Sequence, residues 1–274
     1  ATWDEALSEV ASQFKQASDN LAAVVSSRQP LEALYGFKQL FADKLGSNLV
    51  TSTEEGLYTA DAAVFAEGKK KAFETDLQAL RTAGSVMVVD ADLTVNHQVA
   101  GFFIKRKLGA GTNLLVLDKK ENGLNTNANK VLKPVSGANT DALKALMAAV
   151  VKLGLAKGKT DIKAADLDGL AAATGLKTDD YLDAAYVLTS AAEPVIVYQN
   201  GKELEVLSQL AELVGAKLIS LKGEANSLAA SQLKLEKALK VNGQKAVFFA
   251  IGDDEVSQKA LQEFEKVPFK VVVS

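Results

Sequence analysis

Carboxylates follow several of the apolar runs in this sequence, and their position suggests a chemistry. Asp90 and Asp92 come after SVMVV, Asp118 comes after NLLVL, and Asp253 and Asp254 come after AVFFAIG. If these runs are parallel strands, the acids lie at the carboxyl edges of sheets, where open α/β sheets bind their ligands. Carboxylates there can accept hydrogen bonds from sugar hydroxyls or from a guanine edge. The alternative is structural, because aspartate also caps helices and starts turns, and Asp253 is the strongest candidate for a cap.

Other polar groups have both a chemical and a structural interpretation. His97 has a side-chain pKa near neutrality and could handle protons, but without a second histidine a structural or turn role is favoured. Glu54 and Glu55 lie in a loop-like stretch, where we expect them to be solvated. Asn226 and Ser227 lie in GEANSLAASQ, a small-residue segment that would let the backbone approach a ligand or would simply lead into a helix.

Several classes of site are excluded by the composition and motifs. The absence of cysteine excludes disulfides, thiolate nucleophiles, thiolate zinc sites and iron–sulfur clusters ligated by this chain. A single histidine cannot form a histidine metal site. Gly109-Ala110-Gly111 precedes a strand-like run instead of following one, so it predicts a helix stop and turn and not a dinucleotide fingerprint. The sequence has no P-loop and no Gly-x-Ser-x-Gly motif.

The charge balance gives no reason to expect nucleic acid or an anionic membrane as a partner. The 31 basic and 34 acidic residues are spread along the chain and leave a net charge of −3. No apolar run approaches the ~20 residues that span a bilayer, and no basic segment followed by an apolar one opens the chain. We therefore expect no direct membrane insertion, and a cytoplasmic location either alone or at the membrane through a larger complex.

Short apolar runs alternate with longer amphipathic segments. The runs lack strict polar alternation, which is typical of parallel strands buried on both faces. They are LAAVVSS, SVMVVD, NLLVLD, KVLKPV, PVIVYQN, KLISL, KAVFFAIGDD and FKVVV. Helical spacing is clearest in residues 2–17, where Thr2 is a suitable N-cap, and in residues 31–46 and 139–155, which carry a glycine in or just beyond the last turn. The pattern predicts an α/β fold.

The length predicts two lobes. A chain of 274 residues that is 48% hydrophobic is near the size at which one core splits into two. Residues 52–73 and 155–180 break the apolar pattern and are the candidate crossings. We expect two Rossmann-like, doubly wound lobes with mostly parallel sheets, the second inserted in the first. The first lobe would comprise residues 1–75 plus 184–274 and the second residues 76–183, and the whole reads as a domain cut from a longer polypeptide.

The order of these pieces resembles the molybdopterin oxidoreductase family. TWDEALSEVASQF resembles the tryptophan-led helix that opens the family's region after its cluster domain, and VVSSRQPLE resembles a strand followed by serine, arginine and acid. Residues 86–143 continue the match, with a loop ending near His97, a strand ending in Asp118, a turn containing Ala128 and a helix start at Gly137 through Asp141. Further segments in the family's order are residues 193–218, 223–232, 245–255 and 264–274.

The resemblance implies a cofactor and its contacts. The family includes the catalytic subunit of formate dehydrogenase and the large peripheral-arm subunit of NADH:quinone oxidoreductase. In it, two central α/β lobes flank a bis-molybdopterin guanine dinucleotide held at strand carboxyl ends. By that resemblance Asp118 contacts the guanosine portion, and Asp141 and Asn226 border the same cleft. The segment that supplies the metal ligand in catalytic members reads GSNLVTSTEEGLYTA and has no cysteine, although Ser52 could replace it chemically.

Three hypotheses follow. The first is the central region of a redox-complex subunit, a vestigial scaffold with no catalytic residue, metal ligand or cofactor of its own, beside domains or subunits that carry iron–sulfur clusters. The alternative is the cofactor-binding fragment of an active formate dehydrogenase-like molybdenum or tungsten oxidoreductase, which would retain molybdopterin guanine dinucleotide. A second alternative is an unrelated two-lobed module that closes on a small solute.

Overall fold

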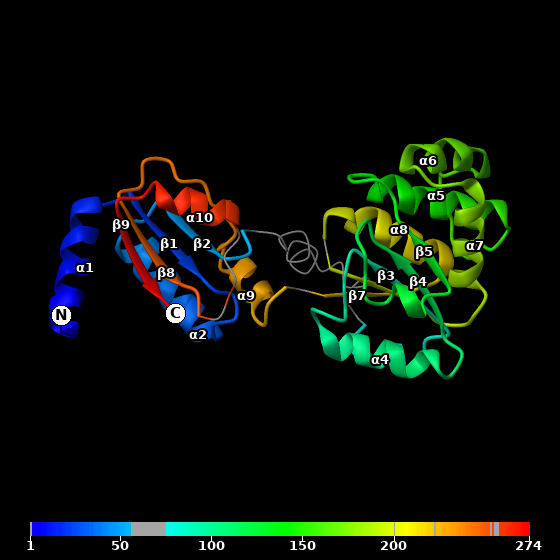
Figure 1. Cartoon of the computed structure of the whole chain (residues 1–274), viewed down its shortest axis with the longest axis horizontal. Coiled ribbons are helices and arrows are strands. Elements are labelled where there is room, and N and C mark those ends of the chain that lie inside the picture. The colour runs from blue at the N-terminus through cyan, green and yellow to red at the C-terminus, as the bar shows by residue number, and fades with distance from the viewer. Residues whose placement is uncertain (1, 56–74, 200, 222, 253, 255–257) are drawn as a thin grey trace. The chain divides into compact units, whose positions relative to one another are not determined.

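The computed structural model describes residues 2–55, 75–199, 201–221, 223–252, 254 and 258–274, which form two compact units (Figure 1). Unit 1 consists of Ala1–Ala62 and Lys222–Ser274, and unit 2 consists of Ala63–Leu221. All pairs of described neighbouring strands within each sheet are parallel. The predicted α/β class, with parallel Rossmann-like sheets and one lobe inserted in the other, is therefore confirmed.

Unit 1 is built on a four-stranded sheet with the order β2-β1-β8-β9. Its strands are β1 (Leu21–Val25), β2 (Leu49–Ser52), β8 (Ala246–Ala250) and β9 (Phe269–Val273). One face packs against α1 (Trp3–Ala17), α2 (Leu31–Lys38) with its π-helical continuation η1 (Gln39–Lys44), and α9 (Ser227–Gln232). The other face packs against α10 (Gln258–Glu265). Phe41 lies at the centre of the first core, with its ring centroid 5.1 Å from that of Phe248.

The first helix begins where the sequence predicts. The Thr2 hydroxyl accepts the Glu5 N–H at 3.3 Å, and the Glu5 carboxylate accepts the Thr2 N–H at 2.7 Å. This capping box satisfies two donors that the first turn would otherwise leave unpaired.

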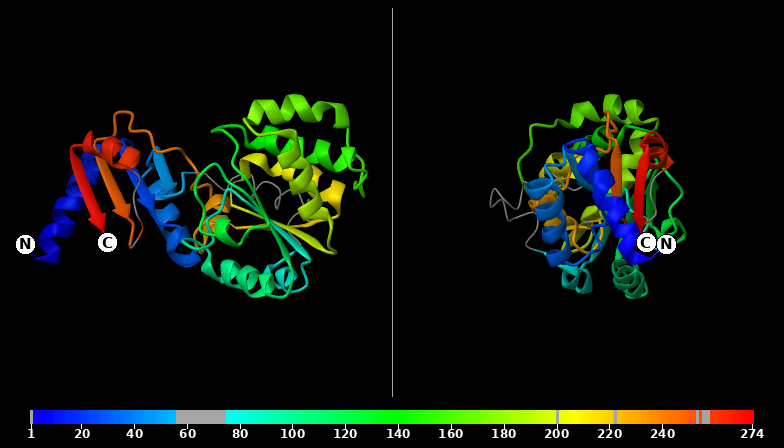
Figure 2. Two further views of the ribbon diagram at one scale, coloured as in Figure 1. Left: turned by 45° about the vertical axis from the view of Figure 1, so that its right-hand side comes forward. Right: turned by 90° about the vertical axis from the view of Figure 1, so that its left-hand side faces the viewer.

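Unit 2 is built on a five-stranded sheet with the order β5-β4-β3-β6-β7. Its strands are β3 (Ser85–Val89), β4 (Asn113–Leu117), β5 (Lys130–Leu132), β6 (Pro194–Tyr198) and β7 (Lys217–Ser220). One face is covered by α5 (Asn139–Lys152), α6 (Leu167–Thr174), α7 (Thr178–Thr189) and α8 (Leu204–Val214). The opposite face is covered by α4 (Gln98–Leu108) and the 3-10 helix η3 (Leu77–Arg81), as the left view in Figure 2 shows for α4. Shorter 3-10 turns are η4 (Asn125–Asn127), η5 (Ala164–Asp166) and η6 (Gly201–Glu203).

The return from the inserted lobe lies later than predicted. Residues 184–221 belong to unit 2, because β6 pairs with the central strand β3 and β7 pairs with β6. The predicted crossing at 155–180 instead contains η5 and α6, which pack within unit 2. The other predicted crossing, 52–73, falls largely outside the described residues. An apolar run does not reveal which sheet it joins, because pairing depends on the partner strand.

The eight predicted strands are all present, and β2 is an additional one. It is a four-residue strand that ends in Thr51 and Ser52, too short and too polar to stand out by composition. The helix stop predicted at Gly109 to Gly111 is confirmed, since α4 ends at Leu108 and Gly111 turns with a φ of 90°.

Each sheet has a switch point where the strand order reverses. In unit 1 it lies between β1 and β8, and in unit 2 between β3 and β6. Open α/β sheets place their ligand crevices outside the carboxyl ends of the strands at such a point. The residues that follow these four strands are therefore the first to consider as a site.

Candidate functional site

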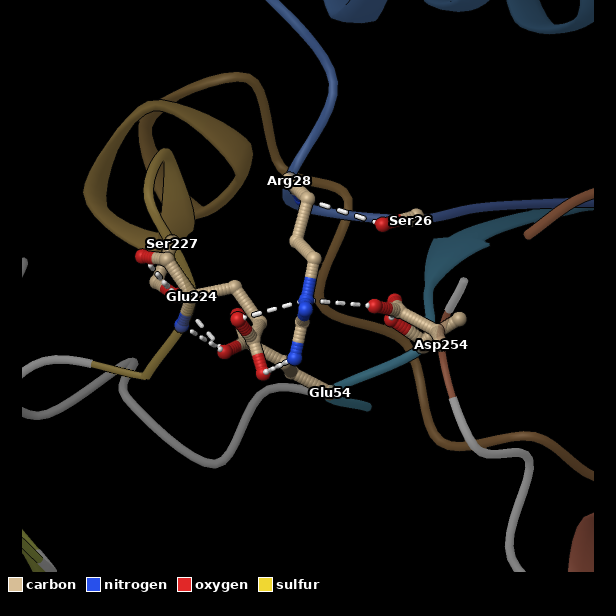
Figure 3. Close-up of polar contacts among 7 residues, drawn as sticks. Ser26, Arg28, Glu54, Glu224, Ser227 and Asp254 are labelled. Atoms are coloured by element: carbon tan, nitrogen blue, oxygen red, sulfur yellow. Dashed lines mark hydrogen bonds and ion pairs between the residues drawn. The ribbon is translucent and has the colours of Figure 1, made fainter. Parts of the chain in front are cut away.

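The switch point of unit 1 is filled by Arg28 and the acids around it (Figure 3). Arg28 follows β1, and its Nε lies 2.8 Å from Oε2 of Glu224 while its Nη2 donates to Oε1 of Glu224 at 3.0 Å. The same Nε lies 2.8 Å from Oδ1 of Asp254, which follows β8. That second contact is an ion pair without the alignment of a hydrogen bond. One guanidinium thus joins the ends of β1 and β8 to the loop before α9.

The acids around Arg28 are held in turn by neighbouring groups. Oε1 of Glu54 accepts the Glu224 N–H at 2.8 Å and the Ser227 O–H at 2.6 Å. Oδ2 of Asp254 accepts the Thr53 hydroxyl at 2.8 Å, and the Asp254 side chain is only 6% exposed. We call Arg28, Glu54, Glu224, Ser227 and Asp254 the Arg28 cluster.

The acid pair after β2 differs from the prediction that it is solvated. Glu54 and Glu55 are half-buried, and Glu55 accepts the N–H of Leu239 at 3.0 Å. Both carboxylates accept backbone N–H groups from segments far along the chain, which the local sequence does not reveal.

Asn226 lies just before α9 in unit 1, and its hydrogen bonds hold the loop after β1. Its backbone N–H donates to Ser27 O at 2.9 Å, and its Nδ2 donates to Gln29 O at 2.9 Å. The side chain therefore positions the loop that carries Arg28.

The switch point of unit 2 is lined by Asp90, Asn139 and Glu203. Asp90 follows β3 with a φ of 51°, and its Oδ2 accepts Nδ2 of Asn139 at 2.8 Å. Asn139 is the first residue of α5 and is 6% exposed. Its Oδ1 is buried without a hydrogen-bond partner among the described residues. The N-cap residue of α5 is Ala138, whose methyl side chain cannot cap the helix.

Two acids at this edge resist ionisation. Burial raises the pKa of Asp90, and the negative charge of Asp118 adds to the increase while Lys119 opposes it. Burial also raises the pKa of Glu203, which follows β6, and the charge of Asp90 adds to that effect. Carboxylates near one another in a partly dry site disfavour the charged form.

Asp118 faces its own loop. Its Oδ1 accepts the Lys120 N–H at 2.9 Å, and its Oδ2 accepts Nδ2 of Asn122 at 3.0 Å. Asn122 also donates to the carbonyl of Ala91 at 2.8 Å and so ties the loop after β4 to the loop after β3. Both oxygens of the carboxylate therefore stabilise the turn that follows β4.

The other predicted residues occupy turns and a helix start. Asp92 accepts the Thr94 N–H and O–H at 3.0 and 2.6 Å and the Gly123 N–H at 3.1 Å. His97 precedes α4 with a φ of 56°, and its carbonyl accepts two N–H groups of the first turn. Asp141 is half-buried in the first turn of α5. Asp118 and Asp141 thus belong to unit 2 and Asn226 to unit 1.

In the part of the chain that the structure describes, no group of three or more His, Asp or Glu side chains could hold a metal ion. Ser52 ends β2, is 2% exposed and donates its N–H to Leu235 O at 3.0 Å. The rest of the family's metal-ligand segment beyond Glu55, and Asp253, lie outside the described residues. In the same described part, no helix has the length and apolarity needed to cross a bilayer.

Sequence reasoning missed Asn139 and Glu203. The sequence does contain a signal for Asn139, because Gly137 stands just before a strong helical pattern. In the structure Gly137 has a φ of 88° and turns the chain into α5. Glu203 follows the run of β6 by a few residues, as Asp90 and Asp118 follow theirs.

A model of the molybdopterin oxidoreductase family matches residues 1–273. Acetylene hydratase from Pelobacter acetylenicus has a similar structure, with a TM-score of 0.57 and 17% identity over 78% of this chain and 33% of the hydratase chain. The formyltransferase/hydrolase complex (FhcABCD) from Methylorubrum extorquens, solved with methylofuran, gives a TM-score of 0.58 and 17% identity over 95% of this chain and 78% of the matched chain. This chain thus spans about a third of the hydratase, and a search of curated protein sequences found no match.

At these identities the two solved structures show a shared fold and no more. The family match, in contrast, covers nearly the whole sequence. The chain belongs to the molybdopterin oxidoreductase family.

Proposed function

We propose that the chain is the central region of a redox-complex subunit and acts there as a scaffold without a metal centre of its own. Its partners would be other domains or subunits that carry iron–sulfur clusters. The solved formyltransferase/hydrolase neighbour is itself a multi-subunit complex, which supports a place among other subunits. The observation that carries the proposal is the Arg28 cluster, which fills the switch point of unit 1 with the chain's own side chains.

Intact members of the family carry a molybdopterin cofactor, so the fit of each switch point to such a group can be judged. A phosphate-bearing arm would meet the carboxylates of Glu54, Glu224 and Asp254 in unit 1, with Arg28 already paired to two of them. Like charges at such distances repel by several kcal/mol where water is partly excluded, by an order-of-magnitude estimate. The residues at this edge of unit 1 do not fit an anionic group.

The switch point of unit 2 favours the second candidate, a cofactor-binding fragment of an active formate dehydrogenase-like molybdenum or tungsten oxidoreductase. The Oδ1 of Asn139, which has no hydrogen-bond partner among the described residues, and the carboxylate of Asp90 are acceptors at a sheet edge, beside the start of α5 at Ala138. Buried acceptors without partners are costly, and a ligand with N–H or O–H donors would satisfy them. These two residues, and not Asp118, would hold the guanosine portion of molybdopterin guanine dinucleotide.

The scaffold proposal is tested by cofactor content. The chain is produced in a host that makes molybdopterin, in medium supplemented with molybdate or tungstate, and the purified protein is assayed for metal and for pterin fluorescence. A family enzyme produced in the same host is the positive control. We expect neither metal nor pterin at stoichiometric level in this chain. Stoichiometric metal with pterin would replace the scaffold by the second candidate.

The second candidate has its own test, a thermal-shift comparison of guanine and adenine nucleotides. If unit 2 retains the nucleotide site, a guanine nucleotide raises the unfolding midpoint and Asn139→Ala abolishes the rise. Asn96→Ala, at an exposed asparagine of the same unit, is the matched control and should leave the rise intact. The scaffold proposal predicts that neither nucleotide raises the unfolding midpoint. A rise in the midpoint with a non-nucleotide solute alone would favour a small-solute module.

A further inference from the structure

Arg28 occupies a position from which α/β sheets contact ligands. It follows β1 at the switch point, where Val25 is paired in register with Ala250 of β8. Two backbone hydrogen bonds hold the loop after β1. Ser26 N–H donates to Ala250 O at 2.8 Å, and Gln29 N–H donates to Ser26 O at 3.2 Å. The guanidinium is therefore presented by a rigid turn at the carboxyl edge of the sheet.

The N–H groups with which Arg28 could bind a phosphate already contact the carboxylate of Glu224. A guanidinium recognises phosphate by two parallel N–H groups, and Nε and Nη2 of Arg28 meet the two oxygens of Glu224 at 2.8 and 3.0 Å. Asp254 adds a second carboxylate 2.8 Å from Nε. The Glu224 carboxylate thus takes the two-point contact that a phosphate would make.

The segments that carry the masking acids are held by neighbouring groups. The Glu224 backbone is anchored to Glu54 through its N–H, and Asp254 is anchored by the Thr53 hydroxyl. The Ser27 hydroxyl, in the same loop as Arg28, is buried without a partner among the described residues, so the loop keeps an unused polar group. A closed anion site accounts for both features.

We propose that Glu224 and Asp254 mask an anion site at Arg28, which takes phosphate or pyrophosphate once Glu224 is neutralised and more tightly when both acids are neutralised. The inference rests on the interpretation of unit 1 under the proposed function, but it concerns Arg28 alone. Metal found in the native chain would end the scaffold proposal and leave the mask untouched, whereas pyrophosphate binding by the native Arg28 would end the mask and leave metal content undecided.

The test compares pyrophosphate binding by calorimetry at low ionic strength. The variants are Glu224→Gln with Asp254→Asn, the same pair with Arg28→Gln, and a control with Asp19→Asn and Asp43→Asn. The control changes the net charge equally at exposed acids of unit 1. We expect no saturable binding by the native chain or the control, saturable binding by the double variant, and about a tenfold or greater loss when Arg28 is also replaced.

Three results would overturn the inference. They are saturable binding by the native chain, no binding by a folded double variant, and equal binding by the charge-matched control. If the double variant does not fold, Glu224→Gln alone serves as the test, because it removes the negative charge that faces Nε and Nη2 of Arg28 while Asp254 is unchanged. That single variant should show saturable pyrophosphate binding, and no binding by it would count against the mask.

Discussion

The two switch points have the same architecture and opposite polar states. In unit 1, a guanidinium between β1 and β8 is paired with two carboxylates, and the surrounding acids accept backbone and hydroxyl donors. In unit 2, the position after β3 holds a half-buried acid beside an asparagine whose Oδ1 has no partner among the described residues. The strand order alone therefore does not decide whether a sheet edge is closed or able to bind.

The difference arises from one charge. Arg28 follows β1, whereas Asp90 follows β3. The cation draws Glu224 and Asp254 onto the edge of unit 1. At the edge of unit 2, burial raises the pKa of Asp90 and of Glu203, and the charge of Asp90 adds to the increase at Glu203. A closed edge needs opposite charges on neighbouring loops, and an edge of like charges leaves acceptors for a ligand.

The largest expected effect on stability tests whether unit 1 and unit 2 unfold independently of each other. Leu146→Ala removes a fully buried side chain from the core of unit 2 and should cost roughly 2–5 kcal/mol. Native-state hydrogen exchange should then show lost protection in β3 and β4 and unchanged protection in β1 and β8. Equal loss in both sheets would show that the two units do not respond independently.

The next effect tests whether the Arg28 cluster is a clamp. Arg28→Met leaves Asp254, with a 6% exposed side chain, without its cation. The cost should be about 1–3 kcal/mol, below the value for a fully buried pair because Arg28 is 53% exposed. Lys266→Met breaks the more exposed pair with Glu263 and should cost less than about 1 kcal/mol. Equal losses by denaturant unfolding would mean that the cluster is an ordinary surface pair.

A smaller effect separates the structural role of Asp118 from a binding role. Asp118→Asn places a second amide group against Nδ2 of Asn122 and loses one of its two acceptor contacts. The unfolding free energy should fall by about 1 kcal/mol. Any nucleotide-dependent shift in the midpoint should persist. Loss of such a shift without loss of stability would return Asp118 to the role that the family resemblance implies.

The smallest effect is a pair of opposite pH dependences in unit 2. Burial raises the pKa of Asp90 above its ordinary 3.8, so its contribution to stability is present below that pH and is lost as pH rises through the folded pKa. For Asp92, burial opposes the hydrogen bonds from Thr94 and Gly123, and the net pKa is lowered. Its contribution is present above the ordinary pKa and is lost as pH falls through the folded value.

The two variants Asp90→Asn and Asp92→Asn isolate these contributions. As pH rises above 3.8, the native chain should lose stability relative to Asp90→Asn, and as pH rises toward 3.8 from below, it should gain stability relative to Asp92→Asn. Denaturant unfolding across acidic pH measures both differences. Slopes of the same sign would contradict the contrast between a strained acid and a satisfied one on the same loop.

The sequence is enough to locate the strands and helices, but it does not show which strands pair with one another. Apolar runs without alternation identify buried strands, and Thr2 with Glu5 identifies a helix start, because both signals are local. The sheet joined by β6 depends on β3, more than a hundred residues earlier in the chain. The same limit applies to the site.

The sequence predicts where some residues of the site lie along the chain, but it does not predict their hydrogen-bond and ion-pair partners. Asp118 is recognisable as a strand-end acid, but its bonds to Lys120 and Asn122 decide that it faces its own loop. The pairing of Arg28 with Glu224 spans 196 residues of sequence, so no local pattern indicates it. Charge pairs between distant loops require the fold before they can be assigned.

The most direct test of the central claim is the exchange rate of the Arg28 Nε–H with water, measured from its side-chain resonance in a ¹H–¹⁵N spectrum of the native chain. If Glu224 and Asp254 hold the guanidinium, this proton exchanges much more slowly than that of Arg106, an exposed arginine on α4, and neutralising both acids speeds it. Exchange as fast as that of Arg106 in the native chain would show that the edge of unit 1 is open, and the contrast between the two switch points would fail.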